Sequence, residues 1–391
     1  MASDWKECTL AELGEIVGGA TPSTKDEQNY GGDIAWITPK DLSTLKGRFI
    51  SHGERNITEK GLHSCSTQIM PKNTVLFSSR APIGYVAIAS NPVCTNQGFK
   101  SIIANEDNDP MFLYYLLKFN KSAIEAMGSG TTFKEVSGNT MRGIRVHVPV
   151  SKAEQQRIAS VLAALDSKIE SNIKVNDNLQ QQALAIFQQE FLREGELPDG
   201  WTSGSLLDIA NYLNGLAMQK FRPADGENGL PVLKIKELRQ GSCDASSELC
   251  SPSIKPEYIV HDGDVIFSWS GSLLVDLWCG GTCGLNQHLF KVTSDKYPKC
   301  FYYAWTAHHL ARFVAIAADK ATTMGHIKRE ELAKAEVVIP DAASMERIGG
   351  ILQPMYDLII SNRIESRKLA ALRDTILPQL MSGELDVSDL T

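Results

Sequence analysis

Apolar and small polar residues recur at alternating spacings of four and three between Ser151 and Phe191, a stretch without proline or glycine. Such an alternation over about four heptads is typical of the a/d seam of a coiled coil. The pattern predicts one long helix whose seam lies against a second helix. The predicted seam residues are Ile158, Leu162, Leu165, Ile169, Leu179 and Ile186.

The same pattern returns between Asp341 and Leu380 in the same register. Asn362 stands in the second stretch where Asn172 stands in the first. Two unrelated helices would not keep one register, so the chain is a duplication in which each half ends in a long helix. The second predicted seam consists of Ile348, Leu352, Met355, Ile359, Leu369 and Ile376.

The asparagines in the first seam, Asn172 and Asn176, have two interpretations. A polar residue at an a or d position fixes the register and the pairing of the helices at some cost in stability. Alternatively, these positions mark where helices of a partner protein pack.

Short β-rich segments precede each long helix, and they match between the halves. Val75–Ser78 corresponds to Val265–Ser268, and each segment is bounded by turn residues. This order predicts a compact α+β domain in each half. Each half also opens on a tryptophan, Trp5 or Trp201, followed by a predicted amphipathic helical turn that ends at a glycine, Gly19 or Gly215. The expected division is two globular domains, 1–150 and 197–340, and two helical segments, 151–196 and 341–391.

Composition limits the possible functions without deciding among them. The chain has 391 residues and a net charge of −7, and no segment is strongly basic. If it binds DNA, a partner must supply part of the phosphate neutralisation. No window approaches the ~18 apolar residues of a membrane span, and the N-terminus does not resemble a signal peptide, so we expect a cytoplasmic protein.

The search for catalytic and metal-binding motifs finds none. The sequence has no Gly-x-x-x-x-Gly-Lys-Ser/Thr loop, no Gly-x-Ser-x-Gly elbow and no His-Glu-x-x-His motif. Four of the eight cysteines, Cys243, Cys250, Cys279 and Cys283, fall in one half without a Cys-x-x-Cys pair. Structural zinc sites usually have tighter ligand spacing, so buried free thiols are the better interpretation. We expect no catalytic residue, no metal and no cofactor on this chain.

Several motifs together resemble the specificity (S) subunit of type I restriction–modification systems. Each motif is short, but their order is specific to that family and the whole chain shows it twice. The second copy departs from it where Met345-Glu346 replaces Glu-Gln and Met355-Tyr356 replaces Leu-Asp. The motifs are Phe77–Gly84, Thr95–Gln97, Gly128–Lys134, Ile144–Pro149, Glu154–Ala159 and Val161–Asp166.

The resemblance implies an architecture and a set of partners. It implies two pseudo-twofold-related target-recognition domains separated by an antiparallel coiled coil of two long helices. Each domain would recognise one half of a split site in double-stranded DNA. Two methylation subunits would dock around the helices, and restriction subunits would complete the assembly. S-adenosylmethionine, ATP and Mg²⁺ are expected on these partner subunits, and the S subunit itself would catalyse nothing.

The repeat sorts the candidate DNA contacts into two groups. Two domains that recognise different sequences should differ at the positions that contact bases, whereas shared residues suit phosphate contacts or scaffold roles. The shared candidates are Lys40, Lys236, Asn96, Asn286 and Thr132. The differing candidates are Arg80, Lys100, Lys134, Trp269, Ser270, His326 and Lys328.

Two other classes of function compete with DNA recognition. A duplicated domain on a coiled coil also suits a protein–protein adaptor without a DNA role, and the acidic net charge favours it. An enzyme with an unrecognised site would have to show turnover from the purified chain alone.

Overall fold

The computed structural model describes residues 4–80, 82–130, 134–193, 195–319 and 327–387. The chain divides into two compact units. Unit 1 consists of Met1–Glu170 with Leu369–Thr391, and unit 2 consists of Ser171–Lys368. Both boundaries fall inside the long helices, so each unit contains one globular part and a section of each helix.

Unit 1 is built on one five-stranded sheet and two smaller sheets. The larger sheet has the order β2 (Gly14–Gly18), β9 (Lys100–Ala104), β6 (Val75–Ser79), β7 (Ile83–Ala89) and β4 (Phe49–Ile50). A three-stranded sheet has the order β5 (Arg55–Ile57), β3 (Tyr30–Ile37) and β8 (Cys94–Thr95). The first strand, β1 (Trp5–Thr9), pairs antiparallel with β10 (Arg145–Pro149), which returns the chain to its start before the long helix.

Unit 2 repeats this plan. β11 (Thr202–Ser205) pairs with β20 (Glu336–Ile339). One four-stranded sheet has the order β12 (Asn211–Asn214), β19 (Leu289–Thr293), β16 (Val265–Ser268) and β17 (Leu274–Leu277). The other has the order β14 (Leu249–Cys250), β13 (Leu230–Leu233), β18 (Cys283–Leu285) and β15 (Ile259–Val260). The parallel pair β3–β8 of unit 1 recurs as the parallel pair β13–β18 of unit 2.

Short helices complete each globular part. Unit 1 contains α1 (Leu10–Leu13), α2 (Pro39–Ser43), α3 (Glu59–His63), α4 (Pro110–Phe119), α5 (Lys121–Ala126), α6 (Gly138–Gly143) and the 3₁₀ turn η1 (Glu27–Asn29). Unit 2 contains α8 (Leu206–Ile209), α9 (Ile235–Gln240), α10 (Lys299–His308), α11 (Leu310–Asp319), α12 (Arg329–Ala333), η2 (Met218–Lys220) and η3 (Pro256–Tyr258).

The prediction that the first helical turn of each half ends at a glycine, Gly19 or Gly215, is wrong in both halves. The helix stops at Leu13 in one half and at Ile209 in the other; strand β2 follows at once, and strand β12 follows after Ala210. In unit 1, Gly14 is extended, with φ of 177°, and Ile16 and Val17 are β-branched residues that favour a strand. Gly19 therefore follows a strand rather than a helix.

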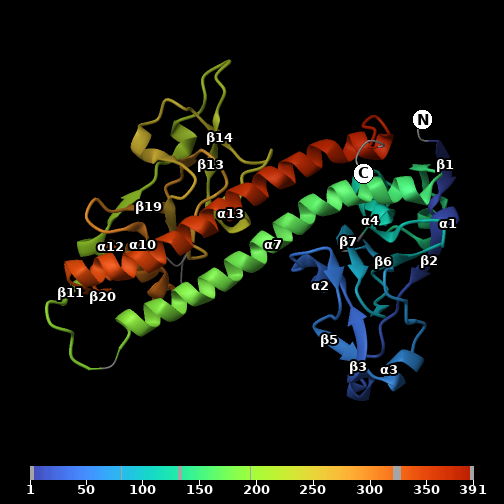
Figure 1. Ribbon diagram of the computed structural model, residues 1–391, viewed down its shortest axis with the longest axis horizontal. Coiled ribbons are helices and arrows are strands. Elements are labelled where there is room, and N and C mark those ends of the chain that lie inside the picture. The colour runs from blue at the N-terminus through green and yellow to red at the C-terminus, as the bar shows by residue number, and fades with distance from the viewer. Residues whose placement is uncertain (1–3, 81, 131–133, 194, 320–326, 388–391) are drawn as a thin grey trace. The chain divides into compact units, whose positions relative to one another are not determined.

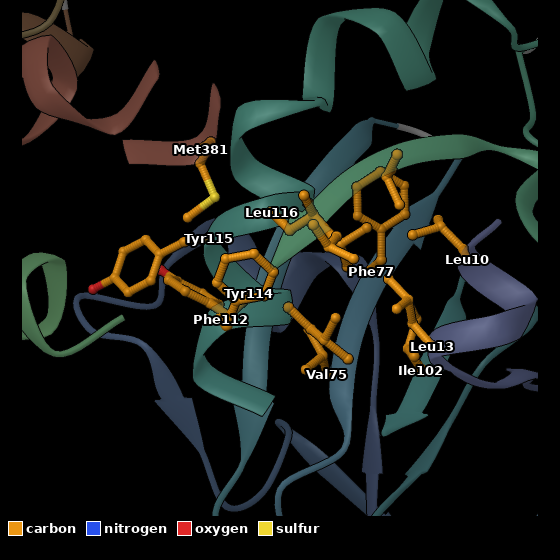
Figure 2. Close-up of a cluster of buried hydrophobic side chains, with 14 of the residues drawn as sticks. Leu10, Leu13, Val75, Phe77, Ile102, Phe112, Tyr114, Tyr115, Leu116 and Met381 are labelled. Atoms are coloured by element: carbon orange, nitrogen blue, oxygen red, sulfur yellow. The ribbon is translucent and has the colours of Figure 1, made fainter. Parts of the chain in front are cut away.

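The main core of unit 1 lies where α1, the central strands and α4 meet. Leu10, Phe77, Ile102 and Phe112 are fully buried there, and Figure 2 shows them in one cluster. Burial of each such side chain contributes about 1.5–3 kcal/mol. Met381, near the end of the chain, packs into the same cluster, so the C-terminal section belongs to the core of the first unit.

The two long helices, α7 (Lys152–Phe191) and α13 (Ala342–Ser382), run antiparallel (Figure 1). In unit 1, Asp166 of α7 contacts Arg373 of α13. In unit 2, Asn176 contacts Asn362, and further along α7 Glu190 contacts Arg347. The partner numbers fall as the α7 numbers rise, which confirms the predicted antiparallel pairing and α+β class.

The predicted seam residues lie along these helix contacts at two levels of burial. Ile158, Leu162, Ile348, Leu352 and Ile359 are buried in the cores of their units. Leu165, Ile169, Leu179, Ile186, Met355, Leu369 and Ile376 are partly buried.

The side-chain amides of the seam asparagines form hydrogen bonds between the two helices. Asn362 Nδ2 donates to Asn176 Oδ1 at 2.9 Å, and Asn172 Nδ2 donates to Glu365 Oε2 at 2.8 Å. Asn172 is only 3% exposed, so an apolar partner would leave its amide unsatisfied. These contacts favour the interpretation in which the asparagines fix the register.

Candidate nucleic-acid interface

The same pair of main-chain hydrogen bonds recurs at one end of a sheet in each unit, and we call this arrangement the frame. In unit 1, Ser79 N donates to Gly98 O at 2.7 Å, and Val136 N donates to Ser79 O at 2.9 Å. In unit 2, Trp269 N donates to His288 O at 3.4 Å, and Ile327 N donates to Trp269 O at 3.0 Å. In each unit, these bonds join a strand end to a later segment of the chain, which contains Val136 in unit 1 and Ile327 in unit 2. Different side chains therefore occupy equivalent main-chain positions.

The side chains on the unit 1 frame are mostly cationic. The Glu135 carboxylate lies 3.6 Å from Arg80 Nη1 and 3.4 Å from Lys100 Nζ. Two main-chain hydrogen bonds with Ser129, of 2.9 and 3.0 Å, fix the position of Glu135. Lys134 is exposed immediately beside it. The structure therefore brings two of the predicted cations, Arg80 and Lys100, together around one carboxylate, and a third, Lys134, is the exposed neighbour of Glu135 in the chain.

Arg142 on α6 belongs to the same surface and was not predicted. Gly138, at the start of α6, lies beside both the Arg142 guanidinium and the Lys100 side chain. Arg142 is exposed, with one hydrogen bond to Ile16 O at 3.4 Å and one to Asn139 Oδ1 at 3.3 Å. Arg142 lies eight residues after Lys134, the end of the motif Gly128–Lys134, and this proximity in the sequence could have indicated it.

The unit 2 frame carries aromatic and neutral polar groups instead. Trp269 Nε1 donates to Asn214 Oδ1 at 2.9 Å. Ser270 Oγ lies 3.0 Å from His288 Nδ1 and is 7% exposed, so its hydroxyl is engaged inside the protein. His288 and Asn214 were not predicted, because nothing in the local sequence connects them to Trp269. Lys328 is exposed, one residue beyond Ile327, which bonds to Trp269.

The shared asparagines have the same structural role in both units. Asn96 Oδ1 accepts from Gly98 N at 2.9 Å, and Asn286 Oδ1 accepts from His288 N at 3.3 Å. Their main-chain N–H groups donate to Ile37 O and Leu233 O, at 3.0 and 3.2 Å. Each asparagine shapes a turn and joins it to the neighbouring sheet, which suits a scaffold role.

The shared lysines lie on short helices beside this turn. Lys40 Nζ is 2.6 Å from Glu54 Oε2, and this hydrogen bond raises the pKa of the Lys40 ammonium. Lys236 Nζ is 2.6 Å from Ser246 Oγ. Both lysine side chains are largely exposed, as phosphate-contacting cations must be. The two remaining predicted residues, Thr132 and His326, lie outside the described residues.

Salt bridges join each globular part to its section of the long helices. In unit 1, Arg48 Nε is 3.0 Å from Glu170 Oε1 on α7. In unit 2, Arg363 and Arg367 of α13 contact Asp276 and Asp262, each at 2.8 Å. The hydrogen bond from Arg367 lowers the pKa of Asp262. These ion pairs connect each globular part to the helix section of the same unit.

Two searches for other kinds of site find nothing in the described ranges. They contain no group of three or more His, Cys, Asp or Glu side chains placed to hold a metal ion. Within the same residues, no helix is long and apolar enough to cross a membrane.

Comparison with known proteins identifies the family. A family model described as the type I restriction modification DNA specificity domain matches residues 2–181 and again 198–371. This chain belongs to that family. The two matches fall on the two halves of the duplication, and the resemblance found in the sequence is confirmed. DNA target recognition is thereby supported, and the adaptor alternative is not favoured.

Individual relatives agree with this assignment. The type I restriction enzyme MjaIX specificity subunit of Methanocaldococcus jannaschii is 34% identical, over 99% of this chain and 95% of that protein. The EcoR124I/EcoR124II specificity subunit of Escherichia coli is 30% identical over 42% of this chain and 41% of that protein. The solved type I S subunit from M. genitalium covers 97% of this chain and 96% of its own, with a TM-score of 0.62 and 16% identity, which shows the shared fold.

Proposed function

We propose that this chain recognises a bipartite DNA site, with residues 1–150 contacting one half and residues 197–340 the other. The proposal rests on one observation: the two units share main-chain hydrogen bonds at a strand end, but they present different side chains there. Arg80 and Lys100 in unit 1 suit hydrogen bonding to guanine O6 and N7 or to phosphates. In unit 2, Trp269 offers an apolar ring that suits contact with a thymine methyl group.

We propose that the helical segments, 151–196 and 341–391, set the number of base pairs between the half-sites. α7 is an unbroken helix of 40 residues, about 60 Å long at 1.5 Å per residue. Its antiparallel pairing with α13 and its buried asparagine contacts support a stiff spacer. A stiff spacer would make the gap fixed in length and free in sequence.

We propose that catalysis takes place on partner subunits and that this chain contributes none. Two methylation subunits would dock on the repeated helical segments, since a duplicated chain presents two equivalent surfaces to identical partners. Restriction subunits would complete the complex in the cytoplasm. S-adenosylmethionine would bind the methylation subunits, and ATP and Mg²⁺ would serve the restriction subunits. The acidic net charge supports the need for partners that neutralise DNA phosphates.

Selection from a random DNA pool tests the core of the proposal. The chain is purified with the methylation subunits of its own system, and bound or methylated DNA is sequenced. We expect two short defined sequences at a fixed separation. Recovery of unselected DNA would contradict DNA recognition and support the adaptor alternative.

Deletion of one heptad from each long helix tests the spacer role. The removed heptads should face each other so that the seam register is kept. The helices then shorten by about 10 Å, roughly three base pairs of B-DNA. We expect a shorter gap between two unaltered half-sites in methylation mapping. An unchanged gap in an active, folded deletion variant would contradict the spacer role.

A further inference from the structure

Two of the eight cysteines lie against each other in unit 2. Cys283 begins β18 and is 0% exposed, in the apolar cluster that also contains Leu238 and Trp278. Cys243, in the loop after α9, is partly exposed and packs against the same cluster. The two thiol groups share a hydrogen bond. A buried thiol is therefore in contact with a thiol that solvent reaches.

The shared hydrogen bond makes the two thiols chemically unequal. It lowers the pKa of the Cys243 thiol, against the effect of partial burial, and a hydrogen bond with Ser247 acts in the same direction. The same bond, together with burial, raises the pKa of Cys283. The thiolate rather than the thiol is the nucleophile in cysteine oxidation. The accessible member of the pair is thus the one that reacts first, and a second thiol is already in contact with it.

The other cysteines have different surroundings. Cys65 is the second partly exposed cysteine, and its Sγ lies 3.8 Å from Gly61 O. Cys94, in the same unit, is buried and forms a hydrogen bond with Thr67. The remaining four cysteines are buried. Cys65 therefore serves as an internal control for any reagent that reacts with accessible thiols.

The repeat has no cysteine at the position that matches Cys283. Gly284 of β18 occupies the place of Cys94 in β8, in the parallel pair that the two units share. The residue before it, Cys283, is therefore matched by Val93. The thiol pair belongs to unit 2 alone, and valine is the replacement for Cys283 that the other half of the chain supplies.

Oxidation of the pair needs a two-electron oxidant, and hydrogen peroxide is one. The Cys243 thiolate attacks one peroxide oxygen, the O–O bond breaks, and the hydroxide that leaves takes up the proton that Cys243 released. Cys283 then attacks the sulfur of the Cys243 sulfenic acid. The S–O bond breaks, an S–S bond forms, and the oxygen leaves as water with the proton of Cys283. Both sulfurs are oxidised, the peroxide is reduced to water, and a reducing thiol reverses the reaction by exchange.

Formation of the S–S bond should move the loop rather than the strand. A disulfide joins its sulfur atoms at about 2.05 Å, which is closer than two hydrogen-bonded thiols approach. β18 is held between β13 and β15, whereas Cys243 lies in the loop between α9 and β14. In this loop, Ser246 Oγ lies 2.6 Å and Asp244 Oδ2 lies 3.6 Å from Lys236 Nζ. A shift of the loop therefore displaces the groups that position Lys236, a candidate DNA contact.

We propose that Cys243 and Cys283 form a modification site at which a peroxide oxidises the two thiols to a reversible disulfide. Oxidation displaces Lys236 and weakens the binding of DNA by unit 2. This effect on DNA rests on the proposed function, whereas formation of the disulfide does not depend on it. A disulfide that forms and is reduced again is the kind that acts as a redox sensor in reducing compartments.

Peptide mapping by mass spectrometry tests the disulfide. The full chain with its methylation subunits is reduced, treated briefly with hydrogen peroxide and alkylated at every thiol that remains. We expect a cross-linked peptide that joins Cys243 to Cys283 and disappears on reduction, while Cys65 stays free for alkylation. Equal alkylation of Cys243 and Cys283 in treated and untreated protein would overturn the proposal.

Matched variants test the order of the two steps. Cys283→Val, which copies Val93, should abolish the cross-link and leave Cys243 as a sulfenic acid that dimedone labels. Cys65→Ser should leave the cross-link unchanged. Thermal unfolding checks that each variant is folded. If Cys283→Val does not fold, Cys243→Ser at the partly exposed position replaces it, and peroxide oxidation of Cys283 in that variant would contradict Cys243 as the attacking thiol.

Binding of a duplex that carries the selected site tests the effect on DNA. We expect oxidation to lower the affinity equally for selected and random duplexes and to decrease the salt slope by about 0.9, the change for one lost phosphate contact. Cys243→Ser should bind as the reduced chain does and should not respond to peroxide. A disulfide that leaves duplex binding unchanged would overturn the effect on Lys236.

The two proposals fail in different ways. A chain that selects a bipartite site but forms no disulfide would overturn the modification site and leave the proposed function standing. A chain that forms the disulfide but selects no sequence would overturn the proposed function and the effect on DNA, and would still support the modification site.

Discussion

The strand ends of the two units share main-chain hydrogen bonds and carry different side chains at several positions. Unit 1 has Arg80 and Lys100 around Glu135, and unit 2 has Trp269 hydrogen-bonded to Asn214. The difference shows where the duplicated chain tolerates change. Main-chain hydrogen bonds define the frame, so side chains on it can vary without loss of the fold, and two copies can recognise different sequences.

The largest expected effect concerns the cores that support these frames. Phe77 and Phe267 occupy equivalent strands and are both 0% exposed. We expect Phe77→Ala and Phe267→Ala each to lower the free energy of unfolding by about 3–5 kcal/mol, because each leaves a cavity. Hydrogen exchange should show the loss mainly in the unit that carries the substitution. Equal loss of protection in both units would contradict their description as separate compact units.

A second contrast lies along the paired helices. Arg373 contacts Asp166, which is 5% exposed, whereas Arg347 contacts Glu190 with its own side chain 54% exposed. We expect Arg373→Met to cost about 3 kcal/mol of stability, since it leaves a buried carboxylate without its cation. Arg347→Met should cost less than about 1 kcal/mol. Denaturant unfolding measures the loss of stability in both variants. A similar loss in the two would contradict the larger contribution expected of the buried Arg373–Asp166 pair.

A substitution in one unit should change base recognition in only one half-site. We expect Arg80→Ala to cost about 1–3 kcal/mol in binding and to relax the preference in one half-site only. Trp269→Ala should act on the other half-site. Binding selection with each variant measures this, and Arg145→Ala, at an exposed position on β10, is the control. A uniform loss across all sequences would instead make Arg80 a phosphate contact.

The smallest expected effect is a pH dependence confined to unit 2. Burial lowers the pKa of His309, which caps α10 and lies 2.8 Å from Glu336 O, whereas Asn120 caps α4 in unit 1. A histidine with a depressed pKa stabilises the fold above its unfolded pKa of about 6.5, and that stability is lost as the pH falls through this value. Burial lowers the pKa of the adjacent His308 in the same direction.

We therefore expect unit 2 to lose protection from hydrogen exchange between about pH 7 and pH 5. The substitution His309→Asn, which copies unit 1, should reduce this loss. An unchanged pH dependence in the variant would show that His309 does not cause it.

The sequence predicted those features that depend on local spacing. Spacings of four and three predicted the long helices, and the β-rich segment Val75–Ser78, bounded by turn residues, predicted the strand observed at Val75–Ser79. Contacts between distant segments were not predictable, because no local pattern pairs Arg48 with Glu170 or places Met381 in the first core. The candidate contacts were found by comparing matched positions of the two halves, whereas the contact of Arg80 and Lys100 with Glu135 could be seen only in the fold.

Exchange of one domain tests the central claim most directly. Residues 1–150 are replaced by the corresponding domain of another family member, and methylation by the complex is mapped. The account predicts a new sequence in one half-site, with the other half-site and the gap unchanged. A change in both half-sites would contradict independent recognition by the two units.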